Sequence, residues 1–167
     1  MLKADGLPAG TITKWEWNAA RDLLAGGFYN FKLTLCHTSL GALTDTYVEN
    51  YDGHTPVTVY SRNPVTIPAV PANQWFGFAF DEPFAYNGRD NLVVEVWWVN
   101  DTNGGGNTQW NFPVAGRCCF SYIVSGNPLN GYPDKGLVSY FMHYMRATVS
   151  PAAVERSSFG RVRALFR

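Results

Sequence analysis

Short runs of alternating apolar and polar residues, separated by turn residues, fill most of this chain of 167 residues. An apolar residue at every second position is typical of a half-buried β-strand, because successive strand side chains point to opposite faces. No stretch keeps a helical period for three turns, and at most single helical turns are expected at residues 19–25 and 40–50. The pattern predicts strands at residues 11–17, 28–36, 57–62, 75–80, 92–99, 108–112, 117–124 and 137–149.

The alternation also assigns faces to the predicted strands. Charged residues make up 16% of the chain, against a usual share of about 25%, and turn and strand formers take their place. We therefore predict an all-β protein: a two-sheet antiparallel β-sandwich, jelly-roll-like, with less than about a tenth of its residues in helices. The clearest inward-facing sets are Tyr29, Phe31, Leu33 and Leu35 in one strand, and Leu92, Val94, Val96 and Trp98 in another.

The pattern divides the chain into a β-sandwich domain at residues 1–149 and a basic tail at residues 150–167. Ser150 and Pro151 end the last predicted strand. In the tail, four arginines stand against Glu155, a net charge of +3, so the remainder of this neutral chain carries −3. A body without a basic face argues against nucleic acid as a partner. No run of about 18 apolar residues exists, so no membrane span is predicted.

Catalytic groups are few and show no motif. Cys36 and His37 are adjacent in a predicted strand, so their side chains point to opposite faces and cannot act on each other. His54 lies in a connection, and His143 in an aromatic strand is interpreted as a hydrogen-bonded core residue. The sequence has none of the usual metal or nucleotide motifs. We predict that the protein is not an enzyme.

Two loops are rich in oxygen ligands. Calcium takes six to eight oxygen ligands, and loops of a sandwich can supply them. The spacing matches no defined motif, so no cofactor or metal is predicted, and the carboxylates are interpreted as solvated; structural Ca²⁺ is the alternative. The residues concerned are Asp45, Glu49, Asn50 and Asp52 in one loop, and Asp81, Glu82, Asp90 and Asn91 around the Asn87-Gly88 turn, which predicts a hairpin.

Trp97 and Glu95 share the outward face of the strand predicted at residues 92–99. An exposed indole ring can stack on the apolar CH face of a sugar, so this pair is the candidate glycan-stacking site. The competing interpretation is that a loop or a neighbouring subunit covers Trp97.

The three cysteines allow one disulfide and one remaining thiol. In an exported protein, Cys36 bonded to Cys118 or Cys119 would join an early strand to a late one. The competing interpretation is three buried thiols.

One stretch of sequence resembles a known family. The words "FYNFKLTLCHTSLGALTDTYVENYDGHTPVTVYSRN" and "QWFGFAFDEPFAYNGRDNLVVEVWW" resemble a β-sandwich module of large bacterial extracellular and cell-surface proteins. The match covers about residues 1–149, departs from the pattern at Cys118-Cys119, and is followed by a tail that looks like a sorting signal. The family has no assigned activity. The resemblance implies an extracellular or cell-surface location, although residues 1–5 lack the apolar region of a signal peptide.

These observations predict a structural or assembly module of a surface layer, filament or adhesin. Its partners would be copies of itself or neighbouring surface-protein domains. The tail alternates as a strand does, less cleanly at Leu165, and could add to a sheet edge of a neighbour. As a helix it would instead present a small apolar stripe, so both conformations are open, and a linker or sorting signal is the alternative. The second hypothesis for function is a carbohydrate-binding module, with glycans as partners. The tail residues assigned to assembly are Phe159, Arg161, Val162, Arg163, Leu165 and Phe166.

Overall fold

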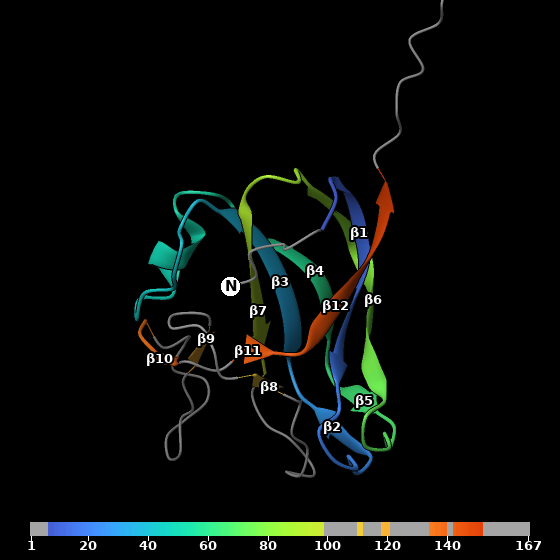
Figure 1. The fold of residues 1–167 in the computed structure, drawn as a ribbon. Coiled ribbons are helices and arrows are strands. Elements are labelled where there is room, and N and C mark those ends of the chain that lie inside the picture. The colour runs from blue at the N-terminus through green and yellow to red at the C-terminus, as the bar shows by residue number, and fades with distance from the viewer. Residues whose placement is uncertain (1–6, 99–109, 112–117, 121–133, 140–141, 152–167) are drawn as a thin grey trace, which may run out of the picture.

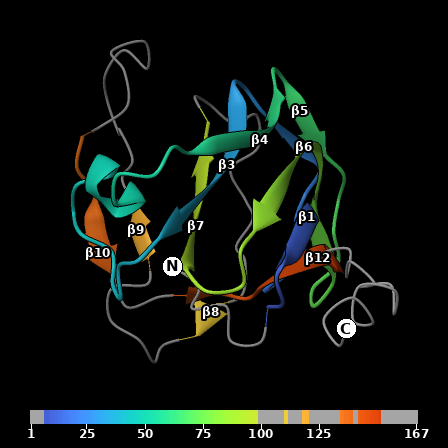
Figure 2. The ribbon, with the colours of Figure 1, turned by 90° about the horizontal axis from the view of Figure 1, so that it is seen from above.

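Two three-stranded antiparallel sheets face each other across the core (Figures 1 and 2). In one, the β1 sheet, the strand order is β12-β1-β6, and in the other, the β3 sheet, it is β4-β3-β7. The predicted all-β sandwich is therefore confirmed. The structure is a computed structural model and describes residues 7–98, 110–111, 118–120, 134–139 and 142–151.

The strands of the two main sheets include most of the predicted ones, and β6 extends six residues beyond its predicted end at residue 80. The β1 sheet contains β1 (Gly10–Asn18), β6 (Trp75–Tyr86) and β12 (Met145–Pro151). The β3 sheet contains β3 (Phe31–Thr38), β4 (Val57–Arg62) and β7 (Asn91–Trp97). Three short pairs are added, and η1 (Val48–Tyr51) is a 3₁₀ turn. The pairs are β2 (Gly26–Phe28) with β5 (Val65–Ile67), β8 (Trp110–Asn111) with β11 (Met142–His143), and β9 (Cys118–Phe120) with β10 (Leu137–Ser139).

The chain crosses repeatedly between the two sheets, as expected for a jelly-roll-like sandwich. It passes from β1 to β3 and β4, returns to β6, crosses to β7 and ends in β12. Because β6 and β7 belong to different sheets, the Asn87-Gly88 turn is a crossing between layers, and the hairpin predicted there is wrong. The Asn87 Oδ1 atom accepts hydrogen bonds from the main-chain N–H groups of Arg89 and Asp90, at 2.9 and 3.0 Å, and Gly88 takes a φ of 73°. These hydrogen bonds from the main chain to the Asn87 side chain stabilise the turn between β6 and β7.

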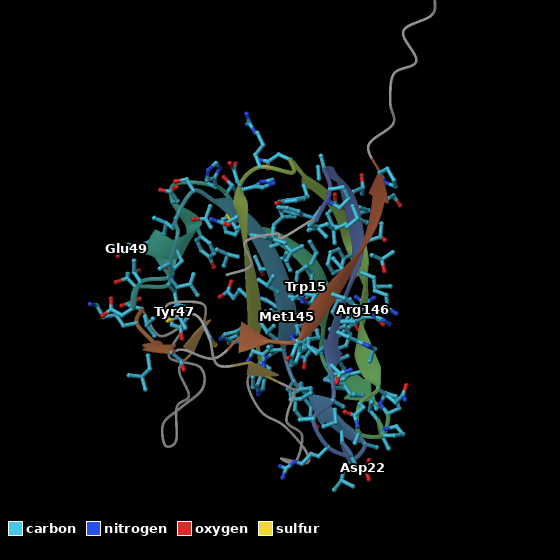
Figure 3. The ribbon with its side chains drawn as sticks, in the orientation of Figure 1. Trp15, Asp22, Tyr47, Glu49, Met145 and Arg146 are labelled. Carbon is cyan, nitrogen blue, oxygen red and sulfur yellow. The ribbon has the colours of Figure 1, made fainter. Side chains whose placement is uncertain are left out.

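The core lies between the inner faces of the two sheets. Trp15 of β1 is almost fully buried there (Figure 3), together with Leu33 and Leu35 of β3. The outer face of β3 is covered as well, because Cys36 and Thr38 are also buried. The η1 connection packs on that face. β3 is thus the most enclosed strand of the molecule's two main sheets, with six buried positions of eight.

Local irregularities interrupt some predicted strands. Asn30 takes a left-handed φ of 49°, which separates β2 from β3 and breaks the strand predicted at residues 28–36. The pairing register of β1 shifts between Ile12 and Lys14 on both sides, a β-bulge in the central strand. The strand predicted at 137–149 is divided into β10, β11 and β12, and β5 was not predicted at all. In the described part of the chain no helix is long and apolar enough to cross a membrane.

Candidate functional site

The two residues predicted to stack on a glycan lie on β7, and each has a partner within the protein. The Lys32 ammonium group lies over the Trp97 ring, 5.6 Å from its centroid. The hydroxyl of Tyr51 donates a hydrogen bond of 2.6 Å to Glu95 Oε2. Both residues are half-buried. Contacts with Lys32 and Tyr51 therefore fix both side chains on the outer face of the β3 sheet. Binding of a sugar by this pair stays a prediction.

Two more exposed aromatic rings directly follow the ends of strands β2 and β7. Trp98 is 46% exposed and Tyr29 is 42% exposed, although the alternation predicted both to face the core. The prediction was wrong because β7 ends at Trp97 and Asn30 breaks the strand after Tyr29. Phe28 contacts the Trp98 ring edge to face, with centroids 5.5 Å apart. Alternation of apolar and polar residues predicts which side of a sheet a side chain faces only while the strand is unbroken.

The three cysteines are free thiols in the structure. Cys36 is buried on the outer face of β3, and burial raises the pKa of its thiol to about 11. Burial likewise raises the pKa of the Cys118 and Cys119 thiols on β9. The predicted bond from Cys36 to Cys118 or Cys119 is not formed here. Thiol titration of the unfolded, unreduced protein tests it directly.

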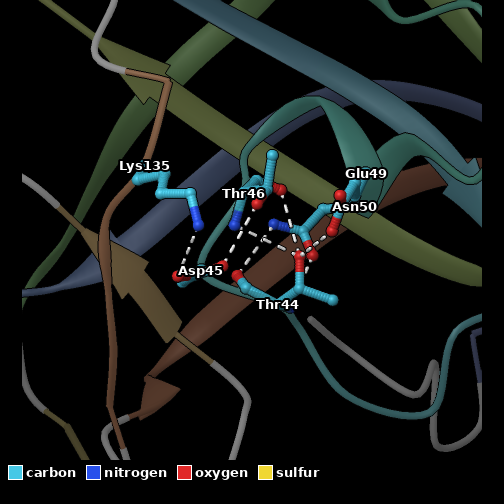
Figure 4. A network of polar contacts seen from close by, with 6 residues as sticks. All are labelled: Thr44, Asp45, Thr46, Glu49, Asn50 and Lys135. Atoms are coloured by element: carbon cyan, nitrogen blue, oxygen red, sulfur yellow. Dashed lines mark hydrogen bonds and ion pairs between the residues drawn. The ribbon is translucent and has the colours of Figure 1, made fainter.

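The loop considered for calcium is a network of internal polar contacts (Figure 4). The Asn50 side chain is buried and makes two hydrogen bonds to the main chain of Thr44, at 2.7 and 3.2 Å. Lys135 lies 3.2 Å from the carboxylate of Asp45 and lowers its pKa, and Asp52 accepts hydrogen bonds from Ser39, which lower its pKa.

Two acidic residues around the second loop, Asp81 and Asp90, are also engaged. Arg62 binds both carboxylate oxygens of Asp81, at 2.5 and 2.7 Å, and lowers the pKa of Asp81. Asp90 accepts a 2.7 Å hydrogen bond from the Asn87 side chain. Among the residues that the structure describes, no three histidine, cysteine or acidic side chains are grouped to hold a metal ion.

A histidine cluster joins β3 to the crossing between β6 and β7. The His37 ring lies 4.9 Å from Phe84 and stacks on Tyr86 at 5.9 Å, centroid to centroid. Its Nε2 atom accepts a 3.3 Å hydrogen bond from the main-chain N–H of Asn87. Burial lowers the pKa of His37, and nearby His54 lowers it further while Asp90 opposes the shift. The alternation of strand side chains correctly placed His37 and Cys36 on opposite faces of the sheet. It did not predict that His37 contacts Phe84 and Tyr86.

The outer face of the β1 sheet carries a buried ionic group. Glu16 is 6% exposed, and its two carboxylate oxygens bind Lys14 Nζ at 2.7 Å and Arg146 Nε at 2.8 Å. The hydrogen bond from Arg146 is the main cause that lowers the pKa of Glu16; burial opposes it and Lys14 adds to it. The Arg146 guanidinium also lies over the Trp75 ring, 4.5 Å from its centroid. These contacts tie β12 and β6 to the central strand.

The β1 sheet has two edge strands, and a groove lies along one of them. β12 and β6 flank β1, and in the described part of the chain neither pairs with a second strand. A groove of about 550 Å³ lies along the first half of β6, between residues 74–78 and residues 65–71. Tyr60 and Phe78, which line it, are stacked with their centroids 4.7 Å apart. We call this the β6 groove.

The tail residues assigned to assembly, residues 159–166, lie outside the described residues. The last described strand, β12, runs to Pro151, two residues past the domain boundary predicted at residue 149. Comparisons with protein-family models, with curated proteins and with solved structures found no match to this chain. Function is therefore inferred from the geometry of the molecule itself.

Proposed function

We propose that this chain is a non-catalytic structural module of an extracellular or cell-surface assembly, such as a surface layer, filament or adhesin, in which copies join head to tail. The observation that carries the proposal is the position of β12. It is an edge strand of the β1 sheet, and the basic tail follows it directly in sequence. A tail that adds to the sheet of a neighbouring copy makes a heterologous contact, and such contacts build open chains.

Charge and sequence pattern support the same proposal. The segment after residue 154 carries +3 and the remainder of the chain carries −3, so tail and body attract each other between copies. Residues 161–164 of the tail also alternate polar and apolar residues, as in a strand. The resemblance to modules of bacterial surface proteins supports the location.

The test compares the intact chain with a chain that ends at Pro151. We expect the intact protein to form species larger than its 18.6 kDa monomer in sedimentation velocity, and the shortened protein to stay monomeric. Circular dichroism and thermal melting establish that the shortened protein is folded. An intact chain that stays monomeric at high concentration, with its tail rapidly cut by protease, would contradict the proposal.

The exposed aromatic rings favour a second candidate function, carbohydrate binding. Trp98 and Tyr29 are exposed, and Tyr29 lines a shallow groove of about 350 Å³ together with Gly26 and Gly27. Aromatic rings can pack on the CH faces of sugar rings.

Affinity electrophoresis in gels that contain soluble polysaccharides tests this second function. Retardation that is lost in Trp98→Ala and Tyr29→Ala would support it, with Trp97→Ala as the variant of the originally predicted site. If no polysaccharide retards the wild-type protein relative to an inert reference protein, the carbohydrate function is wrong.

A further inference from the structure

The β6 groove has the features of an acceptor for one additional strand. One wall is β6, a strand that pairs with β1 on one side only among the described strands. The groove is lined by the rings of Tyr60, Phe76 and Phe78, and by Val65 of β5. Phe76 and Tyr60 are half-buried at the margin of the core. An unpaired main chain beside half-buried apolar rings is what an incoming strand can complete.

We propose that the β6 groove binds residues 159–166 of a second copy of this chain, which adds as a strand along β6. The inference rests on the proposed function and names the acceptor for its tail. The side of the tail that carries Val162, Ala164 and Phe166 faces the rings of the groove. Arg161 and Arg163 then point toward solvent, on the side of the strand that also carries Phe159 and Leu165.

The placement of the two edges supports a second copy as the source of the tail. β12 and β6 lie on opposite sides of β1 in one sheet, so the tail leaves at one edge and the groove lies at the other. A copy placed beside the first can therefore donate at one edge while its own groove accepts at the other. Repetition of the same contact extends the row without closing it.

The tail segment is long enough, when extended, to cover the wall of the β6 groove. The five residues 74–78 of the groove wall span about 17 Å of extended chain, and the eight residues 159–166 of the tail span about 26 Å when extended. Residues 152–158 remain as a connection, which reaches up to about 24 Å when extended. The tail segment is therefore long enough to cover the described wall of the groove.

The experiment uses two full-length variants, each with one half of the contact removed. Ala69→Arg places a long side chain in the groove at an exposed position. Ala42→Arg, in an exposed loop away from the groove, adds the same charge and is the matched control. The tail variant combines Val162→Asp and Phe166→Asp. Melting temperatures check that each variant is folded.

Sedimentation velocity gives the expected result in two steps. Ala69→Arg weakens self-association by about tenfold or more, and Ala42→Arg associates as the wild type does. The groove variant and the tail variant are each monomeric alone. Mixed in equal amounts they form a dimer and no larger species, because one intact tail and one open groove remain in the mixture.

The outcomes separate this inference from the proposed function. If the wild type associates and Ala69→Arg associates equally well, the groove is not the acceptor, although assembly stands. If the mixture of the two variants stays monomeric, the head-to-tail pairing is wrong. If the wild type is a monomer whose tail becomes protease-sensitive only in Ala69→Arg, the groove holds the chain's own tail, and the intermolecular contact is overturned.

Discussion

The side chain of His37 connects β3 to the β6–β7 crossing, and its surroundings favour the neutral form of the imidazole ring. Its Nε2 atom accepts from Asn87 N–H, and a protonated ring could not accept at that atom. Burial between Phe84 and Tyr86 lowers the pKa of His37 below its usual value of about 6.5. At a pH below that value the unfolded state takes up a proton that the folded state resists.

The consequence is a loss of stability in mild acid. We expect the free energy of unfolding to be highest above about pH 6.5 and to fall as the pH is lowered below it. His37→Gln keeps an acceptor but does not titrate, so its stability should change less over the same range. Urea unfolding at several pH values measures both proteins. Burial lowers the pKa of His143 also, and comparison with the variant removes that shared contribution. Equal pH dependence in the two proteins would contradict the role of His37.

For single residues, the sequence predicted the direction of a side chain better than its contacts. The alternation correctly predicted that Phe31, Leu33 and Leu35 face the core. It could not predict that Lys32 and Tyr51 would engage Trp97 and Glu95, because these partners come from other elements of the fold. A side chain's own strand fixes its direction, whereas its partners depend on tertiary structure.

Among the elements, β1 and β6 approach each other unusually closely at one point. Gly77 lies opposite Glu16 in the pairing register. A Cβ atom built on Gly77 would lie 1.9 Å from the Trp15 carbonyl oxygen and 2.6 Å from Glu16 Cα. Both are main-chain atoms of the central strand, so no side-chain rotation could relieve the overlap.

Gly77→Ala should therefore separate the two strands and lower stability. We expect the free energy of unfolding to fall by about 3 kcal/mol or more, at the upper end of the range for overpacked sites. Gly41→Ala is the matched control, since a Cβ atom there meets nothing within 4 Å. Urea denaturation of both variants measures the difference. Equal stability would show that the strands accommodate the added methyl group.

At the scale of elements, the sequence predicted strands better than it predicted their pairing. Residues 57–62 were predicted as a strand and form β4 with the same bounds. The segment from Trp75 to Trp97 was interpreted as a hairpin, yet its two strands lie in different sheets. Alternation is a local property, whereas β6 pairs with a strand some 60 residues earlier (Trp17 with Phe76). For the same reason the β6 groove could not be predicted, because it is lined by residues of β1, β4, β5 and β6 and of the connection between β5 and β6.

For the whole molecule, the opposite charges of body and tail determine how salt acts on assembly. Self-association of the intact chain should weaken as the salt concentration rises from about 0.05 to 0.5 M, because the Debye length falls below about 5 Å. The apolar side of the tail should leave a residual association at high salt. Sedimentation velocity across the series measures this. Association that strengthens steadily with salt would show that charge attraction has no part in it.

The pairing of β1 with both β6 and β12 affects how the chain can fold as it is synthesised. Glu16 and Arg146 are 130 positions apart, so one side of β1 lacks its partner β12 until those later residues have left the ribosome. Contacts between such distant residues form slowly, because a long loop must close first. The β3 sheet is complete by Trp97 and can form earlier, on the strands already made. During that interval β1 offers a bare edge to any extended segment nearby, which makes the first strand the point where chaperone protection matters most.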